Sequence, residues 1–297
     1  INLDKPIGIT STQAIGRVRR VLNAQKLGHA GTLDPLATGI LPIAIGEATK
    51  TIPYVQDKDK VYRFTVAWGA ATATDDREGK IIAQSNDRPS AQAIKSILLR
   101  FVGEIEQIPP KFSAIRIDGQ RAYDLARAGE DVEMKPRTVH VYGLTLLGAD
   151  TDSAEFELAC SKGTYVRSIA RDMGEILGCF GHVSALRRLA VGHFTEETSI
   201  SLDEFEKIMQ KSPPDQVLLP VETALDDIPA LAMTDAEITR IRQGQTLTFL
   251  SRQDHDRLAV AGIDAEECLV LAVGQNRPVA LLEKEGPAFY PVKVFNL

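Results

Sequence analysis

Apolar residues recur at every third or fourth position in three segments, which is the spacing of an amphipathic helix. A residue that can cap a helix precedes each segment: Thr10, Ser11 or Thr12 in the first, Ser90 in the second and Thr164 in the third, which Gly178 ends. The expected inward residues are Ile15, Val18, Val21 and Leu22; Ile94, Ile97, Leu98 and Phe101; and Val166, Ile169, Ala170, Met173 and Leu177. The pattern predicts three helices, each with one face packed on a core.

Alternating apolar and polar residues, many of them β-branched or aromatic, predict strands at 61–67, 139–146 and 155–160. Short strand-like segments, among them 269–273 and 279–282, follow later in the chain. Residues 28–39 are so rich in glycine and proline that we expect a structured loop there instead of a regular element. This mixture of strands and helices predicts an α+β fold and leaves the strand pairing open.

Charge divides the chain into three parts. Residues 1–195 carry a net charge of +3, residues 196–230 a net charge of −7, and residues 231–297 a net charge of −2. The acidic part contains Pro213 and Pro214, and we interpret it as a connector between a large N-terminal domain and a small β-rich C-terminal domain. Although the net charge of the whole chain is −6, the N-terminal domain is therefore mildly basic. Such a domain suits a specific polyanionic partner.

The composition is that of an ordinary globular protein, with 44% hydrophobic and 25% charged residues among 297. No apolar run approaches the roughly 20 residues that span a bilayer, and the first residues lack the apolar stretch of a signal peptide. We therefore expect a cytoplasmic protein that does not bind a membrane. Cys160, Cys179 and Cys268 are odd in number and far apart, which favours reduced thiols over disulfides or a zinc site.

The spaced motifs of most catalytic machinery are missing from the sequence. It contains no His-Glu-x-x-His, no Gly-Lys-Ser/Thr phosphate loop and no Gly-x-Ser-x-Gly, and its histidines and cysteines have no metal-ligand spacing. Asp34 stands out instead, because Pro35 favours an extended backbone at Asp34 and the nearby Gly31 and Gly39 allow a substrate to approach closely. An Asp-Pro pair is more often a turn than a catalyst, so these residues alone do not establish an enzyme.

A longer motif surrounds Asp34. Residues 28–39 read Gly-His-Ala-Gly-Thr-Leu-Asp-Pro-Leu-Ala-Thr-Gly, and this segment resembles the signature of the TruB family of tRNA pseudouridine synthases. Further segments resemble the family in the same order along the chain: 5–11, 46–50, 108–114, 161–167 and 186–189. The resemblance covers about the first 195 residues, and the tail loosely resembles the PUA-type RNA-binding domain. One position departs: the family usually has Asp where this chain has Ala73, so we expect an altered RNA contact there.

The resemblance implies a fold, a domain division and a reaction. It implies a pseudouridine synthase catalytic domain over residues 1–195, with a mixed, largely antiparallel sheet flanked by helices, an acidic connector over 196–230, and a PUA-like domain over 231–297. The implied reaction converts the uridine at position 55, in the T arm of tRNA, to pseudouridine by breaking the N-glycosidic bond and rejoining the base through carbon. It needs no metal or other cofactor and no obligatory protein partner, and tRNA folding is a compatible second activity.

The resemblance also assigns roles to individual side chains. Asp34 would be the nucleophile, and Arg167 would be its ion-pair partner. The Tyr62 ring would lie against the target uracil, and the Tyr62 hydroxyl would be available for proton removal. Tyr165 and Leu186 would complete the walls of the uracil pocket.

Other implied residues contact the RNA around that pocket. His29 would fill the stacking position that an extruded uridine leaves behind. Residues 111–135 would form a flap that closes on the T arm. The expected RNA contacts, which are all basic, are Lys111, Arg116, Arg121, Arg127, Arg187 and Arg188.

Three alternatives remain at this stage. A mainly non-catalytic tRNA chaperone is disfavoured because Asp34, Tyr62 and Arg167 are all present. A guide-RNA-dependent synthase of the dyskerin type shares the Asp34 loop, but residues 35–39 and the short tail favour a stand-alone bacterial-like enzyme. A glycosidase is weaker, since its usual mechanism needs two carboxylates and only Asp34 is marked.

Overall fold

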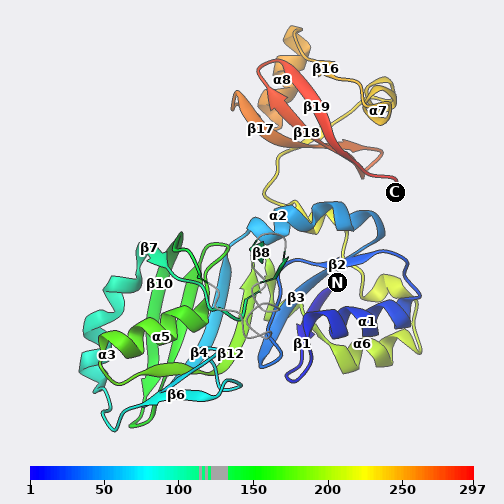
Figure 1. Cartoon of the computed structure of the whole chain (residues 1–297). Coiled ribbons are helices and arrows are strands. Elements are labelled where there is room, and N and C mark those ends of the chain that lie inside the picture. Colours follow the sequence, from blue (N-terminus) through cyan, green and yellow to red (C-terminus); the bar gives the residue numbers. More distant parts are fainter. Residues whose placement is uncertain (114–115, 118–119, 122–132) are drawn as a thin grey trace.

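The computed structural model describes residues 1–113, 116–117, 120–121 and 133–297. Two bodies are visible in Figure 1: a large one built on a mixed sheet, and a smaller β-rich one that contains the C-terminus. Most of the predicted flap, 111–135, and with it Arg127, lies outside the described residues. Among the described residues, no helix is both long and apolar enough to cross a membrane.

The large body is built on one sheet, which has ten strands in the described part of the chain. Its main path runs β14-β1-β3-β12-β4-β11-β10-β7, and β2 and β13 pair at its side with β3 and β12. The strands are β1 (Asn2–Lys5), β2 (Leu27–His29), β3 (Ala37–Ile45), β4 (Lys60–Trp68), β7 (Gly103–Gln107), β10 (Arg137–Ala149), β11 (Ser153–Cys160), β12 (Gly181–Val191), β13 (Phe194–Thr195) and β14 (Ile200–Ser201). Only the pairings of β1 with β14 and of β3 with β12 are parallel in this sheet, so the predicted α+β fold with a mixed, largely antiparallel sheet is confirmed.

The three strands predicted within 61–67, 139–146 and 155–160 lie in β4, β10 and β11, side by side in this sheet. Their inward positions form the core of the large body, where Phe64 and Phe156 stack with ring centres 5.3 Å apart. Smaller pieces lie outside the sheet: β5 (Ala70–Thr72) pairs with β6 (Ile81–Gln84), and β8 (Arg116–Ile117) pairs with β9 (Gln120–Arg121).

The first predicted helix is α1 (Ser11–Leu22), and Thr10 caps it in a capping box with Gln13. Its buried apolar residues are Ala14 and Val18, whereas Val21 is exposed, so the inward position predicted for Val21 is wrong. Ala14 and Val18, four positions apart, define the face that packs on the sheet, and Val21 lies at its edge.

The second and third predicted helices cover the other end of the sheet. Ser90 caps α3 (Ala91–Ile97), as expected, and a short 3₁₀ turn extends it to Phe101. For α5 (Val166–Ile176) the expected cap is wrong: Tyr165 occupies the capping position without a side-chain bond, and the Thr164 hydroxyl donates instead to the Ser161 carbonyl at 3.1 Å.

The expected loop at 28–39 is only partly a loop. Its first two residues belong to β2 and its last three to β3, so the expectation is wrong at both ends. Gly39 explains why a glycine-rich stretch can pair here: its φ is +101°, and an added Cβ would lie 2.1 Å from the Arg188 carbonyl oxygen on the neighbouring strand β12. The remaining loop, between β2 and β3, holds Asp34.

The small body consists of a curled sheet with the order β15-β17-β18-β19-β16. Its elements are β15 (Ala230–Ala232), α7 (Asp235–Arg242), β16 (Leu247–Thr248), α8 (Arg252–Val260), β17 (Glu267–Gly274), β18 (Arg277–Glu285) and β19 (Ala288–Val294). The strands expected at 269–273 and 279–282 lie within β17 and β18.

The two bodies share an apolar contact. Leu271, Leu281 and Phe295 of the small body pack in one cluster with Val55 of α2 (Ile52–Asp57). A hydrogen bond lies beside this apolar cluster: the Lys50 ammonium donates to the Val294 carbonyl at 2.6 Å. The small body is therefore docked beside α2.

Residues 196–230, which we predicted to be a connector, contribute elements to the large body. β14 pairs with β1, and α6 (Leu202–Met209) buries Leu202 and Phe205 against the same cluster as α1. The rest of the segment contains short 3₁₀ turns at Pro214–Gln216 and Val221–Ala224 before β15 begins.

Candidate active site

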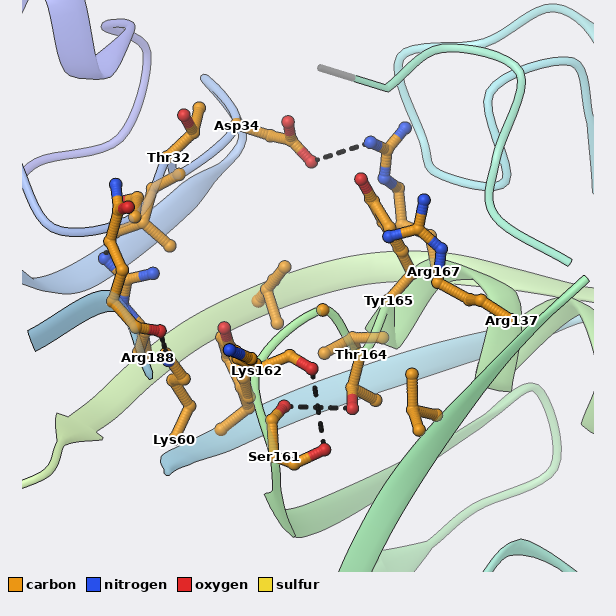
Figure 2. A pocket seen from close by; sticks show the side chains of 18 of the residues that line it. Thr32, Asp34, Lys60, Arg137, Ser161, Lys162, Thr164, Tyr165, Arg167 and Arg188 are labelled. Atoms are coloured by element: carbon orange, nitrogen blue, oxygen red, sulfur yellow. Dashed lines mark hydrogen bonds and ion pairs between the residues drawn. The ribbon is translucent and has the colours of Figure 1, made fainter. Parts of the chain in front are cut away.

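A cavity of about 570 Å³ opens where the loop between β2 and β3 faces β4, β10, β12 and the start of α5. Figure 2 shows the side chains that line it. They come from 31–34, 56–57, Lys60, Tyr62, 137–139, 161–167, Leu186 and Arg188. The fold therefore brings Asp34, Tyr62, Tyr165, Arg167 and Leu186 to one cavity from four separate parts of the chain.

Asp34 and Arg167 form an ion pair across this cavity, with 3.1 Å between Oδ2 and Nη2 (Figure 2). The Arg167 side chain is only 6% exposed, whereas the Asp34 side chain is 36% exposed and reaches the open space. Two backbone carbonyls fix the guanidinium further: Nη1 donates to Thr74 at 3.0 Å and Nη2 to Phe112 at 2.9 Å. The rigid cation orients a carboxylate that stays accessible to a substrate.

Asp76, which the motif analysis did not single out, completes this arrangement. Its carboxylate lies 3.4 Å from Arg167 Nη1 and accepts hydrogen bonds from the Thr74 hydroxyl at 2.5 Å and the Glu78 amide at 3.0 Å. Asp76 is 3% exposed. The available signal was its place in the turn after Ala73, where the chain departs from the family pattern and two carboxylates follow one another.

The pKa of Asp34 reflects opposing influences. Burial raises the pKa of the Asp34 carboxyl above its ordinary value, the Arg167 guanidinium lowers it, Asp76 raises it and Lys5 lowers it. A carboxylate that binds protons more readily than a solvated one is also a stronger nucleophile when ionised, provided that Arg167 keeps it charged.

Tyr62 and Leu186 lie on adjacent antiparallel strands, β4 and β12, and form one wall of the cavity. Burial raises the pKa of the Tyr62 phenol, and the charge of Arg188 partly opposes the rise. The phenol therefore stays protonated near neutral pH, so it can act as a base only if a neighbour takes up its proton.

Two buried cations form the floor beside Tyr62. Arg188 is 2% exposed; its Nε donates to the Ile40 carbonyl at 2.7 Å and its Nη2 to the Gly31 carbonyl at 3.1 Å. Lys60 is 6% exposed, and its ammonium donates to the backbone carbonyls of Gln56 and Lys58 at the end of α2. Burial, together with the charge of Arg188, lowers the pKa of Lys60 to about 8.

Gln107 positions Tyr165, which also lines the cavity. The Gln107 side chain accepts a bond from the Tyr165 amide at 2.7 Å and donates to the Tyr165 carbonyl at 3.0 Å. Since Gln107 is 1% exposed, these paired bonds fix the residue from which α5 starts. Burial raises the pKa of the Tyr165 phenol.

His29 lies in β2 and is not among the described residues that line the cavity. Its Nδ1 is buried without a hydrogen-bond partner in the described structure. Burial and the charge of Arg188 lower the pKa of His29, and a hydrogen bond to the Gly31 backbone partly opposes them. A neutral imidazole next to the loop that holds Asp34 is suited to stacking on bases.

Comparison with known proteins agrees with this geometry. Residues 19–166 match the family model described as TruB family pseudouridylate synthase (N terminal domain), and residues 167–226 match the one described as tRNA pseudouridylate synthase B C-terminal domain. The chain belongs to the TruB family. The second match ends before β15, so neither match covers the small β-rich body, and a PUA-like identity for it is not confirmed.

Relatives and solved structures place the chain further. It is 52% identical to the tRNA pseudouridine synthase B of Caulobacter sp. (strain K31), over 100% of this chain and 96% of that protein. It is 50% identical to that of Rhodopseudomonas palustris (strain ATCC BAA-98 / CGA009), over 99% of this chain and 80% of that protein. Among solved structures, a chain of a Cbf5-Nop10-Gar1 complex matches with a TM-score of 0.73 and 25% identity, over 99% of this chain and 84% of that chain.

The basic residues predicted as peripheral RNA contacts lie in different settings in this TruB family chain. Arg188 is buried inside the cavity, so a surface contact with RNA is not open to it. Arg187 is half-buried between two carboxylates, 2.8 Å from Asp4 and 2.5 Å from Glu196. Lys111 is exposed. Arg116 and Arg121 belong to the small β8–β9 pair, and Arg127 is outside the described ranges.

The described residues include no cluster of three or more His, Cys, Asp or Glu side chains that could hold a metal ion. Cys160 and Cys179 are buried, and burial raises the pKa of the Cys160 thiol to about 11. Two carboxylates line the cavity: Asp34, which pairs with the buried Arg167, and Asp57, which pairs with the exposed Lys162.

Proposed function

We propose that this protein isomerises a uridine of tRNA to pseudouridine, with Asp34 as the nucleophile. The observation that carries the proposal is the Asp34–Arg167 ion pair, which presents one accessible carboxylate to a cavity of about 570 Å³. The proteins to which the chain is about 50% identical over nearly its whole length are named tRNA pseudouridine synthase B.

The reaction separates a uracil from its ribose and rejoins it through a carbon atom. In one route the Asp34 carboxylate attacks C1′ of the ribose, the glycosidic electron pair leaves with the uracil, and the rotated base displaces the carboxylate through C5. In the other route Asp34 adds to the uracil ring, the glycosidic bond then breaks, the ring turns and joins C1′ through C5, and the carboxylate is expelled from the ring. Both routes end with loss of the proton from C5, and Tyr62 lies on the wall from which it could take part in that transfer.

The substrate must present an unstacked base. A uridine inside a folded RNA loop reaches a cavity of this kind only after extrusion, and the neutral His29 beside the catalytic loop could stack in the space that the base leaves. We infer that the target is position 55 in the T arm, as the resemblance of residues 28–39 implies. We also infer a cytoplasmic location, which a tRNA substrate in a bacterial-like protein favours.

The chain is further proposed to act without a protein partner or cofactor. This separates it from the guide-RNA-dependent alternative and from a multi-protein assembly such as the solved Cbf5-Nop10-Gar1 complex, which the chain resembles. That likeness is at 25% identity, whereas the relatives named tRNA pseudouridine synthase B are about twice as similar. Residues 231–297 would add RNA affinity, since none of the cavity residues comes from them.

The decisive experiment compares Asp34→Asn with the wild type, each purified alone and given tRNA transcript. The amide keeps the shape of Asp34 but cannot serve as an anionic nucleophile, so tRNA binding should persist while turnover falls by at least about a thousandfold. Asp152→Asn is the matched control, because Asp152 is also an arginine-paired carboxylate, 2.7 Å from Arg88, but lies outside the cavity. Turnover of Asp34→Asn within tenfold of the wild type would refute the assignment.

The same assay tests the substrate and the partner. Sequencing that detects pseudouridine should find it at position 55 of the transcript with no other protein present. Formation only after addition of a guide RNA or a second protein would favour the guide-dependent mechanism instead.

A further inference from the structure

Arg137 stands at the edge of the catalytic cavity, and neither motif nor resemblance assigned it a role. It is the first residue of β10 and pairs with Gln107 at the end of β7. Its guanidinium carbon lies 6.0 Å from the centre of the Tyr165 ring, and a Cβ added to Gly163 would be 3.9 Å from its Nη1. The guanidinium thus lies near both the Tyr165 ring and the Gly163 backbone, and Figure 2 shows Arg137 beside Tyr165.

Arg137 differs from the other cations of the cavity in its partners. Arg167 pairs with Asp34, and Lys162 pairs with Asp57 at 2.8 Å. Lys60 and Arg188 are held by backbone carbonyls. Among the described residues, no carboxylate or hydrogen-bond acceptor contacts the half-buried Arg137 guanidinium, so its N–H groups are available to a ligand.

The chemistry of the substrate indicates which ligand this is. A nucleotide whose base enters the cavity carries its backbone phosphates across the edge, and a planar guanidinium matches a phosphate with two parallel hydrogen bonds. The Arg137 guanidinium carbon lies over the Tyr165 ring, which restrains the side chain while its N–H groups can still donate.

We propose that Arg137 binds a backbone phosphate next to the target uridine and so positions that nucleotide over Asp34. Arg137 is a positioning residue: its bond to the phosphate orders the substrate before the chemical step. The proposal rests on the proposed function, because it takes an RNA uridine as the substrate.

The test compares Arg137→Gln with the wild type on a T-arm RNA hairpin. We expect KM and Kd to rise by roughly tenfold to a hundredfold, while kcat stays within about twofold. The slope of log Kd against the logarithm of salt concentration should be smaller in Arg137→Gln than in the wild type by about 0.7 to 0.9, which is the contribution of one phosphate contact. Arg63→Gln is the matched control, because Arg63 is an exposed arginine on β4 that pairs with Glu157 and does not line the cavity.

A second arm changes the RNA instead of the protein. Hairpins with a neutral methylphosphonate on the 5′ side or on the 3′ side of the target uridine are bound to both proteins. With the wild type, one of the two should lose as much affinity as Arg137→Gln loses on unmodified RNA. With Arg137→Gln, that same hairpin should bind no more weakly than the unmodified one.

Three results would overturn the inference. One is wild-type affinity and salt slope in Arg137→Gln. Another is that the affinity lost through Arg137→Gln adds in full to the affinity lost through each of the two methylphosphonates. Arg137 would then only support Tyr165. The third is that neither methylphosphonate weakens binding to the wild type. This measurement needs only the wild type, so it tests the proposal even if Arg137→Gln fails to fold. Failure of the proposed function is distinct: the wild type would then form no pseudouridine in unmodified RNA.

Discussion

At the scale of single residues, the site depends on how one guanidinium is shared. Two carboxylates, those of Asp34 and Asp76, contact Arg167, which is itself almost fully buried. Asp76 is held by the Thr74 hydroxyl and the Glu78 amide, so it acts as the fixed anchor, and Asp34 as the member that faces the cavity. The accessible carboxylate is therefore oriented by a partner that cannot turn away.

This arrangement predicts the effect of Asp76→Asn. The amide keeps the shape but removes the charge that anchors Arg167, so kcat should fall by about a hundredfold with a small change in KM. Because Asp76 raises the pKa of Asp34, the acidic limb of the kcat–pH profile should also move to lower pH. Asp172→Asn is the control, since Asp172 pairs with Arg171 on the same helix at 2.8 Å. A fall in kcat with an unmoved acidic limb would contradict the electrostatic part.

The neighbouring Asp75 predicts a pH-dependent stability. Burial raises the pKa of Asp75 from 3.8 to about 6, although Arg171, 3.2 Å away, lowers it. Between these values the folded state binds a proton that the unfolded state releases, so the contribution of Asp75 to stability is lost as pH rises through this window. Relative to Asp75→Asn, the wild type should lose up to about 3 kcal/mol of unfolding free energy between about pH 4 and pH 6.

Urea denaturation of both proteins across that range measures the difference. Asn is a suitable substitute because Asp75 has a φ of +59°, which Asn tolerates. A difference between the two proteins that does not vary with pH, or one that varies in the opposite direction, would show that Arg171 outweighs burial.

At the scale of elements, the start of α5 matters most, because Tyr165 and Arg167 both lie there. The Tyr165 side chain, at the capping position, makes no capping bond; the amide and carbonyl of Tyr165 are instead held by the Gln107 side chain at the end of β7. Strand β7 is an edge of the large sheet, next to β10, whose first residue is Arg137. One sheet edge thus positions both the helix that supplies Arg167 and the guanidinium at the rim.

Replacing Gln107 should disturb stability and catalysis together. Gln107→Leu leaves the Tyr165 amide and carbonyl without their partners in a buried place, so the free energy of unfolding should fall by about 3 kcal/mol. The displaced Tyr165 and Arg167 should also lower kcat. Gln84→Leu, on the exposed strand β6, provides the control for the change of side chain. Denaturation and single-turnover rates check both effects, and an unchanged kcat would mean that α5 is fixed without Gln107.

At the scale of the whole molecule, chemistry and RNA affinity belong to different bodies in our proposal. The small body is docked on α2 through Leu271, Leu281 and Phe295, so its removal would expose apolar surface. Charge reversal is therefore a better test than truncation. Arg242 and Arg277 of the small body line a separate cavity of about 240 Å³ and form no ion pair with described residues.

The double variant Arg242→Glu, Arg277→Glu should raise KM for tRNA several-fold at about 0.1 M salt and keep kcat within about twofold. The double variant Lys95→Glu, Arg100→Glu changes the net charge equally on and beside α3, at the far end of the large body (Figure 1), and should have less effect. Equal effects of the two would show that only total charge matters, and a large loss of kcat would contradict the division between the bodies.

The sequence by itself predicted most of the local elements and the proposed nucleophile. Helical spacing at Ile15, Val18 and Leu22, the caps at Thr10 and Ser90, and alternation in β4, β10 and β11 depend on neighbours a few positions away, so they can be read from the chain. Asp34 was singled out through a twelve-residue motif, because a resemblance over many consecutive positions is far more specific than a single residue.

Tertiary structure alone decided what lies next to Asp34. The roles of Asp76, Gln107 and Arg137 depend on contacts between positions far apart in the chain, and no local spacing records such a contact. The same holds for Arg188, which looks like a surface arginine in sequence but is buried because β12 lies between β3 and β4. Strand order and burial result from the packing of the whole chain, and they decide which charges meet and which remain free for RNA.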